Sequence, residues 1–211
     1  MDTTTIRYDG FPLAITLIGI LALELFAMGI PIANLLIITG SVRVLQAFFI
    51  LYMISHFAGK VHIPGLNRST WIKGIARGLG WSAVFGLFAL SAGALMFVAG
   101  INPFDMITIR LPADNVQLVL FFLVAGCIGP FAEELFFRGV VYGFLRKYGI
   151  FAAITGSTVL FVLAHSVGGI ALTHLIGGLV FAAAYEHEKN ILVPITIHVM
   201  GNLALFSTGI F

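Results

Sequence analysis

Residues 116–138 read VQLVLFFLVAGCIGPFAEELFFR and carry most of the information about the fold class. The stretch begins as an apolar run, and a helix that crosses a bilayer needs about 20 largely apolar residues. It ends in Glu133, Glu134 and Arg138. Ionisable groups at bilayer depth are costly and usually serve a site or a pathway. The stretch therefore predicts a membrane-spanning helix that carries chemistry.

The composition of the whole chain also indicates a membrane protein. Of 211 residues, 60% are hydrophobic and 9% are charged, and the mean hydropathy is +1.08. A soluble domain carries about 25% charged residues, so we predict a polytopic integral membrane protein embedded in the lipid bilayer. A net charge of +2 without a basic run predicts no binding of nucleic acid. The single cysteine, Cys127, excludes an internal disulfide and a Cys-based metal site.

The apolar runs predict an all-α bundle of about seven transmembrane helices (six to eight) in a single membrane domain, 1–211. The fourth span is expected to be interrupted at Gly129-Pro130 and to continue as a helix to about Lys147. The first is long enough to tilt, or to break near Pro31. The expected spans are 11–39, 42–58, 79–100, 116–137, 150–167, 170–186 and 190–210.

Lysine and arginine in the short loops predict the orientation in the membrane. With seven spans and a cytoplasmic N-terminus, eight basic loop residues lie inside and two, Arg43 and Arg110, lie outside. This excess predicts that the N-terminus is cytoplasmic and the C-terminus is outside. The eight inside residues are Arg7, Lys60, Arg68, Lys73, Arg77, Arg146, Lys147 and Lys189.

Polar residues recur at one depth in three of the expected spans. At about 1.5 Å per helical residue, Glu133, His165 and Asn202 each lie about 20 Å from the nearest inferred inner boundary. Three helices are therefore expected to bring polar groups to one layer of the membrane. The clusters are Glu133-Glu134-x-x-x-Arg138, Phe161-x-x-x-His165 and His198-x-x-x-Asn202.

The spacing within the first cluster predicts different roles for its residues. Glu134 and Arg138 are four residues apart, which places them on one helix face as a buried ion pair. Glu133 projects about 100° away and is free for another partner. A carboxylate in a poorly hydrated cavity is suited to act as a general base.

The other two clusters repeat the four-residue spacing. The ring of Phe161 can pack on the imidazole of His165 and orient it. His198 and Asn202 project from one face of the last helix, and paired donors of this kind can hold the oxyanion of a tetrahedral intermediate.

This ordered set of motifs resembles the CAAX-protease and bacteriocin-processing family of intramembrane glutamate endopeptidases. That family includes the prenyl-protein CAAX endopeptidases and the abortive-infection-like proteins. Residues 132–139, AEELFFRG, match the first family motif closely. The resemblance covers about 116–210. It implies a catalytic core bundle there, with 1–115 as accessory transmembrane helices.

The resemblance also implies roles for single residues. Glu133 is the general base that activates water, with His165 sharing that water, and His198 and Asn202 form the oxyanion-stabilising pair. Supporting roles fall to Glu134, Arg138 and Phe161. The implied substrate is the C-terminal or membrane-proximal segment of a membrane-associated protein or peptide, and the implied location is a prokaryotic cell (inner) membrane. A prenylated tail, a bacteriocin leader and a sorting tag stay open, as does the oligomeric state.

Other classes remain as alternatives. No cofactor is expected, yet two histidines and two glutamates could ligate zinc. Intramembrane metalloproteases typically carry His-Glu-x-x-His, whereas residues 187–191, HEKNI, lack the second histidine. Alternatively, a non-catalytic immunity, scaffold or transport protein would use the same polar cluster for binding. In that case Glu24, His56 and His174 would help to line a pathway.

Overall fold

A computed structural model of the chain describes residues 8–31, 34–57, 65, 68–106, 109–165 and 171–210, which contain helices and no strand. The principal helices are α1 (Gly10–Met28), α2 (Leu35–Phe57), α3 (Arg68–Val98), α7 (Ile150–His165), α8 (Ala171–Glu188) and α9 (Leu192–Ser207). Between α3 and α7 run η1 (Pro103–Met106), α4 (Asn115–Leu123), η2 (Val124–Ile128), α5 (Gly129–Glu134), η3 (Leu135–Val141), α6 (Tyr142–Leu145) and η4 (Arg146–Tyr148). The last described turn is η5 (Thr208–Ile210).

Apart from the short turn η1, the described residues make seven helical segments, because α4 to η4 follow one another without a gap. Five described segments are long and apolar enough to cross a membrane, and α7 is a shorter apolar helix. The five are Gly10–Met28, Leu35–Phe57, Arg68–Val98, Asn115–Tyr148 and Leu192–Ile210. The prediction of an all-α polytopic bundle with about seven helices is confirmed.

Three predicted boundaries are wrong. The first helix ends at Met28 and the second begins at Leu35, so the expected spans 11–39 and 42–58 divide the chain at the wrong place. The side chain of Asn34 explains the early start of α2, because it accepts hydrogen bonds from the backbone N–H groups of Leu36 and Ile37. The third helix begins at Arg68 rather than at 79, since its basic first half is helical as well.

The segment from α4 to η4 positions the first motif. It starts at Asp114, whose side chain accepts a hydrogen bond from the backbone N–H of Gln117. The interruption predicted at Gly129-Pro130 is a change of helical winding, because π-helices η2 and η3 flank α5. Single π-helical turns are frequent at functional sites. The segment ends before Gly149, whose φ of +113° favours glycine.

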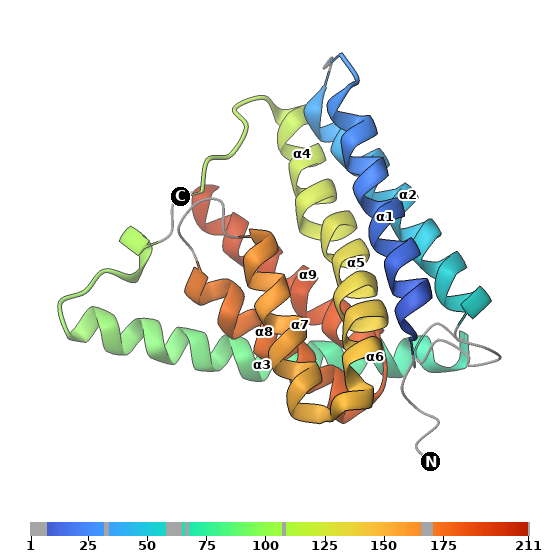
Figure 1. Cartoon of the computed structure of the whole chain (residues 1–211). Coiled ribbons are helices and arrows are strands. Elements are labelled where there is room, and N and C mark those ends of the chain that lie inside the picture. The colour runs from blue at the N-terminus through green and yellow to red at the C-terminus, as the bar shows by residue number, and fades with distance from the viewer. Residues whose placement is uncertain are drawn as a thin grey trace.

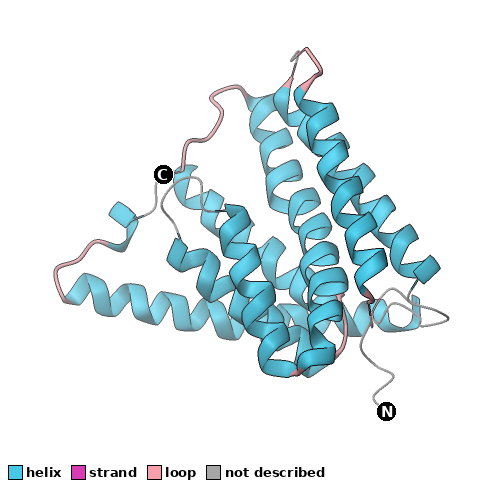
Figure 2. Ribbon diagram, in the orientation of Figure 1, coloured by secondary structure: helices cyan, strands magenta, loops and turns pink. Residues whose placement is uncertain are grey.

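The helices form a bundle around the motif segments (Figures 1 and 2). Helices α1, α2 and the α4–α6 segment lie side by side, and α3 runs across the bundle at a steep angle to them. Small residues let α3 approach α9 and the residues just before it closely. An added Cβ at Gly78 would meet Thr196 at 2.5 Å, and one at Gly74 would meet Asn190 at 2.7 Å. The outer faces carry exposed large apolar side chains, as expected of a lipid-facing surface.

Candidate active site

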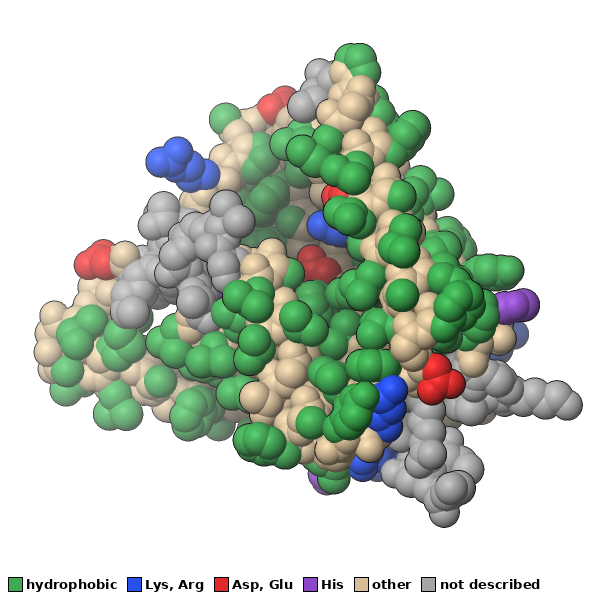
Figure 3. All heavy atoms as spheres, in the orientation of Figure 1, with side chains coloured by type: hydrophobic (Ala, Val, Ile, Leu, Met, Phe, Trp, Pro, Cys, Tyr) green, Lys and Arg blue, Asp and Glu red, His purple; other side chains and the backbone are tan. Residues whose placement is uncertain are grey.

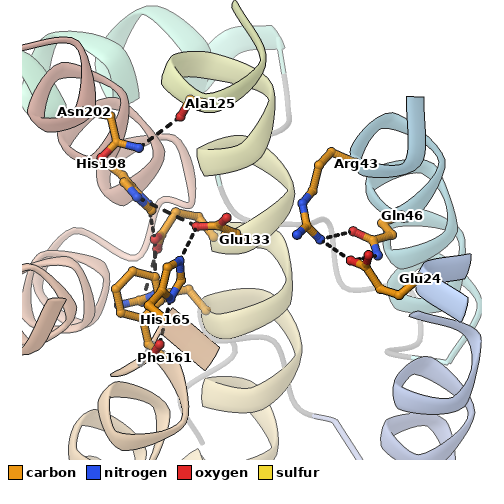
Figure 4. Close-up of polar contacts among 11 residues, drawn as sticks. Glu24, Arg43, Gln46, Ala125, Glu133, Phe161, His165, His198 and Asn202 are labelled. Carbon is orange, nitrogen blue, oxygen red and sulfur yellow. Dashed lines mark hydrogen bonds and ion pairs between the residues drawn. The ribbon is translucent and has the colours of Figure 1, made fainter. Parts of the chain in front are cut away.

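Three helices bring Glu133, His165 and His198 together (Figure 4). Oε2 of Glu133, on α5, lies 3.4 Å from Nε2 of His165, the last residue of α7. The same oxygen lies 3.8 Å from Nε2 of His198 on α9. The side chain of Glu133 is 21% exposed and that of His165 is 25% exposed, so both retain accessible surface.

The opposite nitrogen of each imidazole is engaged by an acceptor. Nδ1 of His165 donates to the backbone oxygen of Phe161 at 2.8 Å, and Nδ1 of His198 donates to Oε1 of Glu134 at 2.9 Å. These contacts place the proton of each neutral ring on Nδ1 and turn Nε2 toward Glu133. In the neutral rings both Nε2 atoms can therefore accept hydrogen bonds, whereas a doubly protonated ring would donate from Nε2.

Glu134 and Arg138 form the base of the site and have no exposed side-chain surface. Nη1 of Arg138 donates to Oε1 of Glu134 at 3.1 Å, and Nε lies 3.1 Å from Oε2 as an ionic contact without hydrogen-bond geometry. Nη2 donates to the backbone oxygen of Gly178 at 3.0 Å. The guanidinium also lies over the rings of Phe161 and Phe181, 5.1 and 5.4 Å from their centroids. A buried charge is held by this combination of an opposite charge, hydrogen bonds and aromatic faces.

Asn202 is anchored to the π-helical part of the motif segment. Its Nδ2 donates to the backbone oxygen of Ala125, in η2, at 3.0 Å. An amide nitrogen carries two hydrogens, so one remains available to a second acceptor. Asn202 lies one turn beyond His198 on α9, and Figure 4 shows both side chains on the side that faces the motif segment.

The seven residues singled out from the sequence thus lie in one site. Glu133 faces the two imidazoles, while Glu134 pairs with Arg138 and turns away from His165. The ring of Phe161 lies 4.4 Å from that of His165, centroid to centroid. His174, on α8, stacks on His165 with a centroid distance of 4.7 Å. Sequence spacing could not assign His174 to the site, because the contact joins two different helices.

Arg43 is a second residue that sequence analysis misplaced. It was counted with the outer basic residues, at the start of the expected span 42–58, but it is the ninth residue of α2 and lies well inside the candidate span Leu35–Phe57. It pairs with Glu24 of α1 at 2.7 Å. The space-filling view shows acidic and basic side chains at the bottom of a hollow between apolar helix faces (Figure 3).

No metal centre is evident in the parts of the chain that the structure describes. These contain no group of three His, Cys, Asp or Glu side chains placed to hold a metal ion. The side chains closest to such a group are Glu133, His165 and His198. Metal analysis of the protein therefore tests the zinc alternative.

Comparison with known proteins gives the class of the C-terminal half. Residues 115–204 match the family described as type II CAAX prenyl endopeptidase, Rce1-like. The resemblance predicted from the three motifs is confirmed over these residues, and the chain is similar to membrane peptidases of the CAAX protease family.

Two curated bacterial proteins show the similarity in detail. YdiL of Bacillus subtilis (strain 168), whose name describes a membrane peptidase, is 36% identical over 91 residues, 42% of this chain and 37% of that protein. The membrane-embedded CAAX protease MroQ of Staphylococcus aureus (strain USA300) is 33% identical over 97 residues, 43% of this chain and 38% of that protein. The matched regions thus span less than two fifths of these relatives. No solved structure shows significant similarity to the chain.

Proposed function

We propose that the protein is an intramembrane endopeptidase in which Glu133 activates a water molecule for attack on a peptide bond. The observation that carries the proposal is the convergence of Oε2 of Glu133 and Nε2 of His165 and His198, at 3.4 and 3.8 Å. A water bound between Oε2 of Glu133 and Nε2 of His165 would donate its two protons to these acceptors and direct a lone pair at a substrate carbonyl carbon.

The proton balance uses the same residues. Glu133 accepts a proton from the attacking water as the C–O bond forms. It then delivers that proton to the amide nitrogen as the C–N bond breaks, which leaves a carboxylic acid and an amine. The hydrogen bond from His165 to the backbone oxygen of Phe161 holds the imidazole in place. His165 can therefore share the water with Glu133 during the reaction.

The tetrahedral intermediate carries a negative oxygen that needs donors. The second hydrogen on Nδ2 of Asn202 can supply one. Because Nδ1 of His198 is committed to Glu134, Nε2 donates only from the doubly protonated ring. The two neighbouring carboxylates supply charge that balances this cation. Glu134 and Arg138 then act as positioning residues beneath His198.

The substrate class follows from the location of the site. Its polar atoms lie among helices whose outer faces are apolar, so a substrate reaches them from the membrane. We propose that the substrate is the C-terminal or membrane-proximal segment of a membrane-associated protein or peptide. The names of the relatives, which describe membrane peptidases, support this reading.

The test compares protein termini in membranes from cells that express the native protein or its Glu133→Gln variant at equal levels. New termini that appear only with native Glu133 would support proteolysis and identify the substrates. Glu188→Gln serves as the matched control, because Glu188 pairs with Arg77 at the end of α8 and lies outside the site. If the Glu133 variant accumulates normally and no termini differ, a binding or immunity function replaces the proposal.

A further inference from the structure

A second charged cluster, formed by Glu24, Arg43 and Gln46, lies where α1 meets α2 and has no part in the proposed chemistry. Gln46 is buried, while the side chains of Arg43 and Glu24 are 30% and 41% exposed. Arg43 is eight residues from Leu35, the first residue of α2, which is about 12 Å along the helix. An arginine at this depth in a spanning helix is costly, and such residues usually mark a substrate or ion pathway. The cluster is therefore a candidate binding site for a ligand as well as a structural contact between helices.

The guanidinium of Arg43 is held at one end only. Its Nη1 donates to Oε1 of Glu24 at 2.7 Å and to Oε1 of Gln46 at 2.6 Å. Nε2 of Gln46, which is 2% exposed, also donates to Glu24 at 2.9 Å. Within the residues that the structure describes, Nε and Nη2 of Arg43 have no hydrogen-bond partner. Glu24 and Gln46 thus hold the guanidinium in place, and its remaining N–H groups are available to another acceptor.

The free side of the guanidinium is turned toward the proposed reacting centre. Figure 4 shows Arg43 extending from α2 toward Glu133. Its charge is near enough to interact with Glu133 and His165. A cavity of about 310 Å³, lined by α1 and α2 residues that include Glu24 and Arg43, adjoins the cluster.

The alignment of α2 with the α4–α6 segment gives the axial distance between Arg43 and Glu133. An added Cβ at Gly40 of α2 would meet Val124 at 2.8 Å, and one at Gly139 would meet Ile54 of α2 at 3.0 Å. The two segments therefore run parallel, and Arg43 lies level with residues 127–128. Glu133 is about six residues further, which is an axial offset of about 8 Å. Two to three residues of extended peptide cover about that length.

We infer that Arg43 binds the C-terminal carboxylate of the peptide whose bond Glu133 attacks; this inference rests on the function proposed above. The arginine fork matches a carboxylate geometrically, and charge-assisted hydrogen bonds are the strong ones. Lipid phosphates lie at the ends of spanning helices, about 12 Å from this level. The C-terminal carboxylate of a peptide bound at Glu133 would be an anion at this level. Arg43 then sets the distance from the end of the chain at which the enzyme cuts.

The test uses purified full-length protein in lipid nanodiscs and a synthetic library of short apolar peptides. The library is prepared once with free C-terminal carboxylates and once as C-terminal amides. We expect the native protein to cleave the acids with a kcat/KM at least about tenfold higher than the amides, the factor for losing one charge-assisted hydrogen bond. Cuts are expected at a constant short distance from the carboxyl end.

Variants assign that preference to Arg43. Arg43→Gln should bring the acid-to-amide ratio close to one, and Arg43→Lys should retain part of it. Because Arg43→Gln leaves Glu24 unpaired and could impair folding, Glu24→Gln/Arg43→Gln removes both charges together. The ratio is measured within each variant, so a general loss of activity does not obscure it.

The outcomes separate this inference from the function on which it rests. Equal cleavage of acids and amides by the native protein, with cleavage still dependent on Glu133, overturns the role of Arg43 and leaves the endopeptidase standing. A preference for acids that survives in both Arg43→Gln variants also overturns it. Absence of cleavage, or cleavage that persists in Glu133→Gln, overturns the proposed function and the inference with it.

Discussion

Nδ1 of His198 donates a hydrogen bond to Oε1 of Glu134 over 2.9 Å, so the fully buried glutamate orients the histidine whose other nitrogen faces Glu133. The next residue back, Glu133, faces Nε2 of the same ring. Two adjacent carboxylates therefore contact opposite sides of one imidazole. Their substitution is expected to have opposite consequences for stability and activity.

Glu134→Gln is expected to destabilise the protein. It leaves the fully buried guanidinium of Arg138 without its counter-charge, and breaking a buried ion pair costs about 3–5 kcal/mol. Glu133→Gln should leave stability nearly unchanged while abolishing cleavage, because this carboxylate is partly exposed and its contacts are longer. Unfolding of both variants in detergent, followed by circular dichroism, measures the difference. Equal stability of the two variants would contradict the structural role of Glu134.

Asn202→Ala is expected to reduce kcat/KM by about a hundredfold or more, the effect of removing one oxyanion donor. The bond to Ala125 is also lost, and a single neutral hydrogen bond contributes about 1 kcal/mol to stability. The variant should therefore still fold. Steady-state kinetics on a substrate identified from the termini experiment tests this, and a reduction of less than tenfold would count against an oxyanion role.

Gly178→Ala is expected to disturb the site from below. The added Cβ would meet Cγ2 of Thr158 at 2.9 Å and the ring of Phe161 at 3.3 Å, next to the carbonyl that Arg138 uses. Overpacking of this kind typically costs about 1–3 kcal/mol. Gly80→Ala on α3 is the matched control, because nothing lies within 4 Å of its added Cβ. Comparable unfolding midpoints for the two variants would contradict this prediction, because they would show that α8 shifts to accommodate the added methyl group without loss of stability.

Chelation provides a direct test of the chemistry. Water activation by Glu133 and His165 needs no metal ion, so cleavage is expected to continue after dialysis against a strong chelator. Metal content of the purified protein, measured by elemental analysis, should be well below one atom per chain. Loss of activity on chelation, with recovery on adding zinc, would favour the metalloprotease alternative instead.

Much of the candidate site was accessible from the sequence, because its members occur in pairs four residues apart. Glu134 and Arg138 share a helix face wherever that helix lies, and the same holds for Phe161 and His165. Helical geometry alone therefore predicts these contacts. The common depth of Glu133, His165 and Asn202 was predicted by counting residues from the inferred inner ends of their spans.

Hydropathy was less informative about helix ends. It joined Ile37 and Thr39 to the first span, although Asn34 caps a new helix just before them. It also began the second span at 42, which put Arg43 at the outer end of that span, because a charged residue interrupts an apolar run. Pairing with Glu24 makes that charge acceptable inside the bundle, and hydropathy treats each residue without regard to its partners.

Composition and helical periodicity were sufficient to predict the membrane bundle and the order of its polar motifs, since both depend on neighbours along the chain. Contacts between helices depend on how the apolar surfaces pack, so they had to come from the three-dimensional structure. These include the bond from His198 to Glu134, the stacking of His174 on His165 and the anchoring of Asn202 to Ala125. The position of Arg43 relative to Glu133 belongs to the same group, because their helices are brought together only by packing.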